Sequence, residues 1–421
     1  MASDSRLVDL CEEVVDCPHS TPRWTDSGAT VLRSHNIRNG RLDLSNRSFT
    51  DEANFRDRIR RAQPREGDLV ITREAPMGEV AMIPAGLRCC LGQRMVLLRP
   101  DPTKVDPRYL LYALQSPQLQ YEIGLHDGTG STVSNLRIPL LESLPIPTPP
   151  LTEQRRIAST LGALDDKIEL DHRMSQTLES MARALFKSWF IDFDPARAKS
   201  EGRDPGLPAT VSELFPAAFV DSSLGDIPSG WHIGRLGDVL DQRVERCTPS
   251  AETASRPYVP IECISPRSLA LVESRPGVEA QSSLIKFYQG DVLFGAMRPY
   301  FHKVCIAPFD GTTRTTAFVL HPRLIGDFAF AAFLLHDAET IDYATQHSTG
   351  STIPYAVWEG SLKDMPIVLP SPGIRSAFDV LARPLLARLR GPYFQDQALT
   401  SARETLLPGL LSGDLDFRAS A

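Results

Sequence analysis

The sequence repeats three short motifs in the same order, at a spacing close to 220 residues. The motif GDLV returns as GDVL, TGSTV returns as TGSTI, and LPIP returns as MPIV. Their positions are 67–70 and 290–293, 129–133 and 349–353, and 144–147 and 365–368. One such match arises easily by chance, whereas three collinear matches indicate two copies of one structural unit. The repeat therefore predicts two globules of similar fold.

Both copies show the same pattern of expected secondary structure. In the first copy the β-rich runs DLVITRE, GEVAMI and QRMVLLRP precede the helical pattern DPRYLLYALQSPQLQYEI, with Pro107 near the helix start. In the second copy DVLFGAM, HKVCIA and TAFVLHP are followed by DFAFAAFLLH. We therefore predict an α+β protein in which each copy is a mixed α/β globule.

A long amphipathic helix is expected after the first globule. Pro149 and Pro150 end that globule, and Thr152 is a suitable N-cap for the helix. Apolar residues then recur at steps of four and three, which is typical of a coiled-coil seam, although ordinary core packing produces a similar stripe. The expected seam residues are Ile157, Leu161, Leu164, Ile168, Leu178 and Leu185, interrupted by Asp171 and Ser175.

The C-terminal segment is the expected partner of this helix, because an isolated apolar stripe would be exposed to water. Its seam residues are predicted at Phe378, Leu381, Leu385, Leu399 and Leu406. Pro384 and Pro392 predict that this second helix is kinked or broken. The predicted organisation is a globule (1–150), a helix (151–190), a linker rich in Pro, Gly and Ser (191–222), a second globule (223–370) and a second helix (371–421).

Composition narrows the class of protein. The net charge of -7 argues against a simple basic DNA-coating protein. Arginine outnumbers lysine, which suits nucleic-acid recognition but also follows from genomic composition bias. Seven cysteines without a C-x-x-C pair, and no signal peptide or spanning segment, predict a cytoplasmic protein.

Motifs of catalysis are missing from the sequence. It contains no phosphate-binding loop of the G-x-x-x-x-G-K-[ST] type, no H-E-x-x-H, no G-x-S-x-G and no N/D-P-P-Y/F tetrapeptide. The run Asp165–Asp166–Lys167 matches the loose D-x-K end of a nuclease site, but its place within the helix pattern favours a solvated helix face. We expect a chain that is not itself an enzyme and that binds no cofactor or metal.

Three segments give the sequence a resemblance to a known family. They are LPIPTPPLTEQRRIASTLGALDDKIELDHRMSQTLESMARALFKSWFIDFDP, LGDIPSGW and ETLLPGLLSGDLDF. With them the chain resembles the specificity (S) subunit of type I restriction-modification systems. The resemblance implies two target recognition domains separated by two long antiparallel, coiled-coil-like helices, with an internal pseudo-two-fold repeat.

The resemblance also implies function and partners. Each target recognition domain would read one half of a bipartite sequence in double-stranded DNA. Adenine-specific methyltransferase (M) subunits with S-adenosylmethionine, and restriction (R) subunits with ATP and Mg, would assemble on the chain, and no membrane would be involved. Partner subunits can share the phosphate neutralisation that dominates DNA affinity, which makes the acidic net charge acceptable.

Residues for DNA contact are predicted in loops near strand ends, where each also has a plain surface or core-edge interpretation. The set in the first copy is Arg33, Asn36, Arg38, Arg73, Arg94, Gly130, Ser131 and Thr132. The set in the second copy is Arg298, Tyr300, Lys303, Arg314, Gly350, Ser351 and Thr352. The T-G-S-T motifs can expose backbone N–H groups to phosphate, or can form a tight turn, or both.

Two other functions remain open from the sequence. A two-headed protein-interaction scaffold without DNA recognition is compatible with the duplicated helices. A self-sufficient nuclease is disfavoured by the missing motifs.

Overall fold

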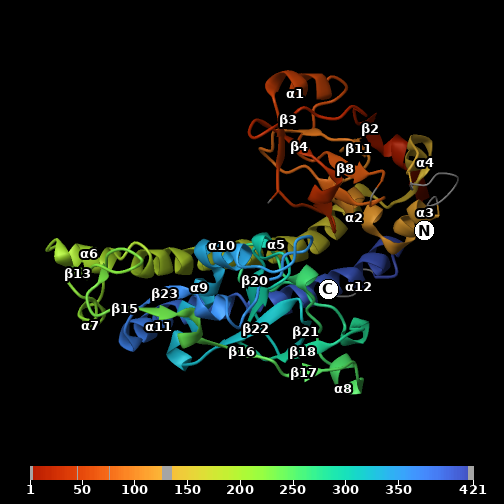
Figure 1. Ribbon diagram of the computed structural model, residues 1–421. Coiled ribbons are helices and arrows are strands. Elements are labelled where there is room, and N and C mark those ends of the chain that lie inside the picture. The colour runs from red at the N-terminus through yellow and green to blue at the C-terminus, as the bar shows by residue number, and fades with distance from the viewer. Residues whose placement is uncertain (1–2, 45, 75, 126–134, 416–421) are drawn as a thin grey trace. The chain divides into compact units, whose positions relative to one another are not determined.

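The structure is a computed structural model that describes residues 3–44, 46–74, 76–125 and 135–415. The chain divides into two compact units, Met1–Lys167 with Leu399–Ala421, and Ile168–Ala398 (Figure 1). Both units contain helices and sheets, and the predicted α+β class is confirmed. The domain limits predicted from the sequence stay a prediction, since each unit combines a globule with parts of the long helices.

The main sheet of the first unit has four antiparallel strands in the order β2-β11-β8-β9. These strands are β2 (Cys11–Asp16), β11 (Met95–Pro100), β8 (Leu69–Thr72) and β9 (Val80–Met82). Val96 and Leu98 of β11 pack in one hydrophobic core, whereas Met95 and Leu97 pack in another. Because successive strand residues point to opposite faces, the sheet is buried on both sides. This explains why β11 is a continuous apolar run.

Smaller elements complete the first unit. A second sheet has the order β10-β4-β7-β3, and its strands are β10 (Cys89–Leu91), β4 (Ala29–Leu32), β7 (Ser48–Thr50) and β3 (Trp24–Thr25). The paired strands are β1 (Ser3–Arg6) with β12 (Pro145–Thr148), and β5 (Ile37–Arg38) with β6 (Arg41–Leu42). The helices are α1 (Glu52–Arg58), α2 (Pro107–Gln115), α3 (Pro117–Gly124), α4 (Ile138–Ser143), and the 3-10 helices η1 (Leu7–Leu10) and η2 (Ser34–Asn36).

The second unit repeats this arrangement. Its main sheet has the order β16-β22-β19-β20, with β16 (Leu240–Arg243), β22 (Ala317–Pro322), β19 (Val292–Gly295) and β20 (Val304–Ile306). Strands β15 (His232–Arg235) and β23 (Pro366–Leu369) pair as β1 and β12 do. Helices α9 (Phe328–His336) and α10 (Ala338–Gln346) follow β22, as α2 and α3 follow β11. The strand order of the two main sheets is thus the same, as the sequence repeat predicts, whereas the smaller sheet has four strands in the first unit and three in the second.

The remaining elements of the second unit are short. The strands are β13 (Phe219–Val220), β14 (Ile227–Pro228), β17 (Arg246–Cys247), β18 (Leu284–Phe287) and β21 (Gly311–Arg314). The helices are α6 (Asp194–Ser200), α7 (Ala209–Ser212) and α8 (Ala251–Ala254). The 3-10 helices are η3 (Leu236–Asp238), η4 (Ile261–Cys263), η5 (Gly277–Glu279), η6 (Pro299–Phe301), η7 (Ile325–Asp327) and η8 (Leu362–Asp364).

The long helices pass from one unit into the other. Helix α5 (Leu151–Phe190) has 40 residues. The C-terminal segment forms two helices, α11 (Pro372–Arg388) and α12 (Gly391–Ser412), with Pro384 inside α11 and Pro408 inside α12. Helix α11 continues past Pro384 to Arg388, and the break between the two helices lies at 389–390, directly before Gly391–Pro392. The break lies there because a proline supplies no backbone N–H to the preceding turn but is tolerated in the first turn of a new helix.

Within each unit the helices pack antiparallel. In the first unit Ile157 and Leu161 share a core with Leu407, Leu410 and Leu411. In the second unit His172 lies 2.6 Å from Asp396, and further along α5 the ring of Phe190 lies 5.0 Å from that of Phe378. Later residues of α5 therefore meet earlier residues of the C-terminal segment, which is the antiparallel arrangement.

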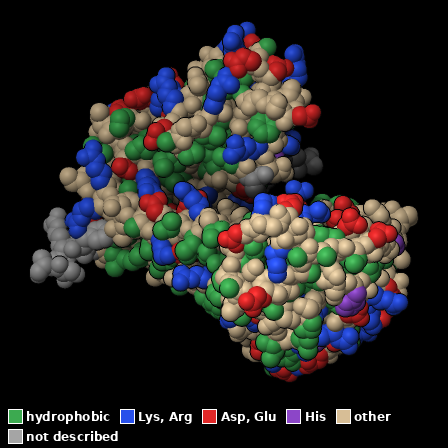
Figure 2. Space-filling model, turned by 90° about the vertical axis from the view of Figure 1, so that its left-hand side faces the viewer, with side chains coloured by type: hydrophobic (Ala, Val, Ile, Leu, Met, Phe, Trp, Pro, Cys, Tyr) green, Lys and Arg blue, Asp and Glu red, His purple; other side chains and the backbone are tan. Residues whose placement is uncertain are grey.

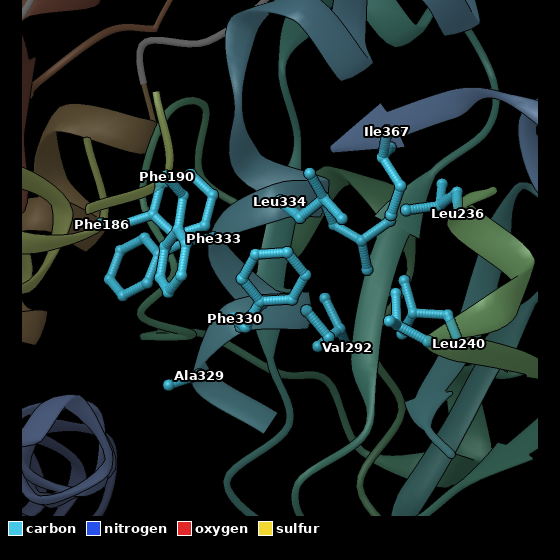
Figure 3. Close-up of a cluster of buried hydrophobic side chains, with 14 of the residues drawn as sticks. Phe186, Phe190, Leu236, Leu240, Val292, Ala329, Phe330, Phe333, Leu334 and Ile367 are labelled. Carbon is cyan, nitrogen blue, oxygen red and sulfur yellow. The ribbon is translucent and has the colours of Figure 1, made fainter. Parts of the chain in front are cut away.

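Aromatic residues dominate the core of the second unit. Figure 3 shows Phe186, Phe190 and Phe333 beside one another, with Phe330 and Val292 between them and Leu240. The centroid of the Phe190 ring lies 4.9 Å from that of Phe330, in an edge-to-face arrangement. Helices α5 and α9 and the main sheet are thereby joined in one core.

The seam along α5 departs from the prediction after Ile168. The buried positions there are Asp171, Ser175, Glu179, Ala182, Phe186, Trp189 and Phe190, and the expected Leu178 and Leu185 are only half-buried. The Ser175 and Glu179 side chains are tolerated in the seam because they have hydrogen-bond partners. The Ser175 hydroxyl donates to the Asp171 carbonyl at 2.9 Å, and Glu179 accepts from the Leu269 backbone N–H at 3.1 Å.

Other predicted seam residues also lie outside the seam centre. Leu381 is 40% exposed, because Phe378, Ala382 and Leu386 of the same helix face the core. Leu164, Leu385, Leu399 and Leu406 are half-buried. The stripe predicted from leucine spacing lies one residue from its true position at three places, because Glu179, Phe186 and Ala382 face the core instead of Leu178, Leu185 and Leu381.

Candidate nucleic-acid interface

Three loops of the second unit meet at one end of its main sheet. The Ala296 N–H, just after β19, donates to the Thr316 carbonyl, just before β22, at 2.9 Å. The Ala356 N–H then donates to the Ala296 carbonyl at 2.8 Å. Residues from three distant parts of the sequence are thus held together by backbone bonds.

The same three bonded positions occur in the first unit. The Arg73 N–H, just after β8, donates to the Arg94 carbonyl, just before β11, at 2.8 Å. The Leu136 N–H donates to the Arg73 carbonyl at 3.0 Å. The predicted pair Arg73 and Arg94 is therefore brought together, at the place that matches Ala296 and Thr316. We call this duplicated arrangement the three-loop site.

The side chains of Arg73 and Arg94 differ in their exposure to solvent. The Arg73 guanidinium is 12% exposed and donates to Asp16 at 3.0 Å and to the Leu136 carbonyl at 2.9 Å. Arg94 is 55% exposed and lies 3.1 Å from Glu74. Arg73 therefore organises the loops, and Arg94 presents its charge to solvent.

The predicted residues near β4 and β5 also divide into two kinds. Arg33 is exposed, and its guanidinium lies 5.2 Å from the centroid of the Trp24 ring. Arg38 is exposed as well. Asn36 is buried, and its amide donates to the carbonyls of Asp43 at 2.8 Å and Asn46 at 3.1 Å. The proposed base contact of Asn36 is corrected, because these bonds use both amide hydrogens.

The T-G-S-T motif of the second copy forms a tight turn. Thr349 and Tyr355 exchange two backbone hydrogen bonds of 2.8 Å, and Gly350 has φ +92°. A Cβ at this glycine would lie 2.7 Å from the Ile353 carbonyl, so the turn requires glycine. Gly350, Ser351 and Thr352 are exposed at its tip, where phosphate contact stays a prediction. Gly130, Ser131 and Thr132 of the first copy lie outside the described residues.

Of the remaining predicted residues of the second copy, Arg298 is bonded next to this turn, and Tyr300 and Lys303 follow Arg298 in the sequence. The Arg298 N–H donates to the Pro354 carbonyl at 2.8 Å, next to the turn. Tyr300 is 49% exposed. Lys303 is half-buried and donates to the Ile261 carbonyl at 2.7 Å, so its assignment as a DNA contact is corrected to a structural tie. Burial lowers the pKa of Lys303.

Arg314 is exposed at the end of β21, next to two tyrosines. Burial raises the pKa of Tyr258 and of Tyr355, and the positive charge of Arg314 partly opposes the increase in both. Arg314 is thus accessible to an anion such as a DNA phosphate.

The repeated Gly–Asp motif has a structural role that the sequence alone did not assign. Asp68 accepts the Arg65 N–H at 2.9 Å and the Arg99 guanidinium at 2.9 and 3.0 Å. In the second unit Asp291 accepts the Tyr288 N–H at 2.8 Å and the Arg243 guanidinium at 3.0 Å. Each carboxylate closes the turn before a central strand and neutralises a neighbouring arginine. The recurrence of the motif was the signal for this role.

Two exposed aromatic residues near the candidate site were not predicted, namely Trp24 and Phe301. On the face drawn in Figure 2, Lys and Arg side chains are interspersed with Asp and Glu side chains. Within the described residues, every helix is too short or too polar to cross a membrane.

Comparisons with known proteins agree with this architecture. Residues 26–180 match the family model described as the type I restriction modification DNA specificity domain. The MjaIX specificity subunit of Methanocaldococcus jannaschii is 28% identical over 369 residues, which cover 83% of this chain and 78% of that protein. The HindI specificity subunit of Haemophilus influenzae is 34% identical over 162 residues, which cover 38% of this chain and 34% of that protein.

A solved structure has the same fold. The crystal structure of the S subunit of a type I restriction-modification system from M. genitalium superposes with a TM-score of 0.56 at 16% identity. The match covers 97% of this chain and 96% of that one. The resemblance stated from the sequence is thus supported: residues 26–180 match the type I restriction modification DNA specificity domain, and most of the chain is similar to a type I restriction enzyme specificity subunit.

Proposed function

We propose that this chain reads a bipartite sequence in double-stranded DNA, one half with each three-loop site. The main support for this proposal is the duplication of the three-loop site, in which both backbone hydrogen bonds of one unit occur at the matching positions of the other. Exposed arginines and hydroxyl groups near the loops supply donors for phosphates and base edges, as in direct readout of a groove. The chain gives sequence specificity and is not itself catalytic.

Partner subunits carry the chemistry in this proposal. Methyltransferase subunits would bind S-adenosylmethionine, and restriction subunits would use ATP and Mg. The seven cysteines of the chain are free thiols, which suits the proposed cytoplasmic location.

The outer face of α5 offers a surface for a partner subunit. Leu170, Met174 and Met181 are 60%, 38% and 56% exposed. Their spacing of four and seven residues places them on one face of the helix. Exposed apolar side chains in a row are typical of a protein interface, and methionine adapts easily to a partner. We assign this face to the methyltransferase subunit.

The direct test is to express the methyltransferase subunit with and without this chain and to sequence the methylome. A split adenine motif should be methylated only when the chain is present. The assignment fails if the methyltransferase modifies the same sites alone. Binding of other proteins without any methylated motif would support the interaction scaffold.

A further inference from the structure

Two neighbouring aromatic side chains are exposed in the loop that follows β19. Tyr300 is 49% exposed and Phe301 is 47% exposed, and their ring centroids are 4.8 Å apart. They belong to the short helix η6. A buried aromatic ring contributes far more to stability than an exposed one, so folding alone does not explain this placement.

The backbone around these rings adopts an unfavourable conformation. Arg298 and His302, which flank η6, have φ of 53° and 54°, and the neighbouring Arg267 has φ of 58°. They are three of the six non-glycine residues with positive φ in the described chain. Such residues cost free energy and concentrate at functional sites, where surrounding contacts hold them.

Hydrogen bonds hold this loop in place. Arg298 N–H donates to the Pro354 carbonyl at 2.8 Å, and Arg267 N–H donates to the His302 carbonyl at 2.8 Å. The His302 Nε2 lies 2.9 Å from the carbonyl of His336, a buried residue of α9. The two rings are therefore held in an exposed position before any partner binds.

The surroundings of the rings suit a polyanion. Arg267 is exposed beside the loop, and the tip of the turn at 350–352 offers exposed hydroxyl groups. This turn is joined to the loop through the bond from Arg298 to Pro354. The aromatic pair thus continues the three-loop site.

We propose that Tyr300 and Phe301 form an aromatic wedge that inserts at a base step of the DNA half-site read by the second unit. This inference rests on the proposed DNA-reading function. Proteins that insert apolar side chains between base pairs unstack and bend the duplex. Pyrimidine–purine steps deform most easily, so the half-site should contain a TA or CA step at the insertion position.

The test uses the full chain assembled with its methyltransferase subunit and duplexes that contain the methylated sequence. 2-Aminopurine replaces adenine at successive positions of the half read by the second unit, because its fluorescence increases when stacking is lost. The methylated adenine itself is left unlabelled, since a methyltransferase flips its target base out of the stack without any wedge. We expect an increase at one step with the native chain. The matched control Ile325→Ala, at an 86% exposed position in the same unit, should give the same increase.

Phe301→Ala should abolish the increase and weaken binding roughly tenfold, as expected for the loss of one stacked aromatic ring. Tyr300→Ala should act in the same direction. A duplex with a mismatch at the insertion step should bind more tightly to the native chain, because the unstacking cost is already met. This gain should disappear in Phe301→Ala.

Two results would overturn the wedge. One is a native complex that causes no fluorescence increase at any position, and the other is an increase that Phe301→Ala retains. Loss of methyltransferase binding in Phe301→Ala, with DNA contact unchanged, would assign the rings to a protein partner instead. Selective methylation by the native complex is measured in the same preparations, so failure of the wedge is separated from failure of the DNA-reading function.

Discussion

The backbone N–H of Arg73 donates to the carbonyl of Arg94 at 2.8 Å, and this bond joins two loops that each precede or follow a central strand. Its counterpart in the second unit joins Ala296 to Thr316 at 2.9 Å. The duplicated bond fixes loop positions while leaving side chains free to differ. A scaffold of this kind permits the two units to read different sequences.

Arg94→Ala should reduce methylation and relax the preference at one base position, in one half of the motif only. Its exposed guanidinium is available for base or phosphate contact, and one good bidentate base contact contributes about 1–3 kcal/mol of discrimination. Methylome sequencing reports the motif. Arg56→Ala is the control, since Arg56 is an exposed arginine of the same unit paired with Glu52. Equal effects of the two substitutions would contradict a specific role for Arg94.

Asp68→Ala should destabilise the first unit by about 3 kcal/mol, because it removes the buried carboxylate partner of Arg99 and leaves only the partly exposed Glu13 to pair with it. Asp68 and Arg99 are joined at 2.9 Å with little exposure of either side chain. The measurement is chemical denaturation monitored for the first unit. Asp57→Ala, which breaks an exposed pair with Arg60, should change the unfolding free energy by less than about 1 kcal/mol. A similar loss in both variants would show that the Gly–Asp motif has no special structural role.

Phe378→Ala should cost about 3–5 kcal/mol, because its ring is fully buried between α5 and α9. Leu381→Ala should cost less than about 1 kcal/mol, since Leu381 is 40% exposed. Thermal and chemical unfolding of the two variants compare these residues directly. A larger loss of stability in Leu381→Ala would contradict the arrangement in which Phe378, and not Leu381, faces the core.

The stability of the second unit should fall as the pH decreases from about 6.5 towards 3. Burial, with help from the positive charge of Arg183, lowers the pKa of His336 to about 3. The unfolded chain therefore binds a proton in this range that the folded chain excludes, and this costs roughly 2 kcal/mol between pH 7 and 5. His336→Gln should flatten the pH profile, whereas His232→Gln, at an exposed position, should leave it unchanged. An unaltered profile in His336→Gln would contradict this assignment.

Local chemistry made much of the fold predictable. Pro149 and Pro150 mark the end of the first globule, and α5 follows at Leu151. The apolar runs became central strands, and the repeated motifs revealed the duplication. The helical pattern after Pro107 was expected as one helix but forms α2 and α3, because the Ser116 hydroxyl caps a new helix at Pro117 by accepting the Leu119 N–H at 3.3 Å.

The candidate site was less predictable than the fold, because the type of a residue does not reveal whether its side chain is exposed and free to contact DNA. Asn36 and Lys303 are polar residues near strand ends, yet Asn36 donates both amide hydrogens to the carbonyls of Asp43 and Asn46, and Lys303 donates to the carbonyl of Ile261. Phe301 was not singled out from the sequence, and it is 47% exposed because the hydrogen-bonded loop around it holds it at the surface. Only the tertiary contacts show whether a polar side chain is accessible to DNA or is held by hydrogen bonds within the protein.

The most direct test of two independent reading units is a domain exchange. Residues 1–150 are replaced with the corresponding domain of a related specificity subunit, and the methylome of cells with the hybrid and the methyltransferase is sequenced. One half of the methylated motif should change to that of the relative, and the other half should stay the same. A change in both halves, or in neither, would contradict the assignment of one half-site to each unit.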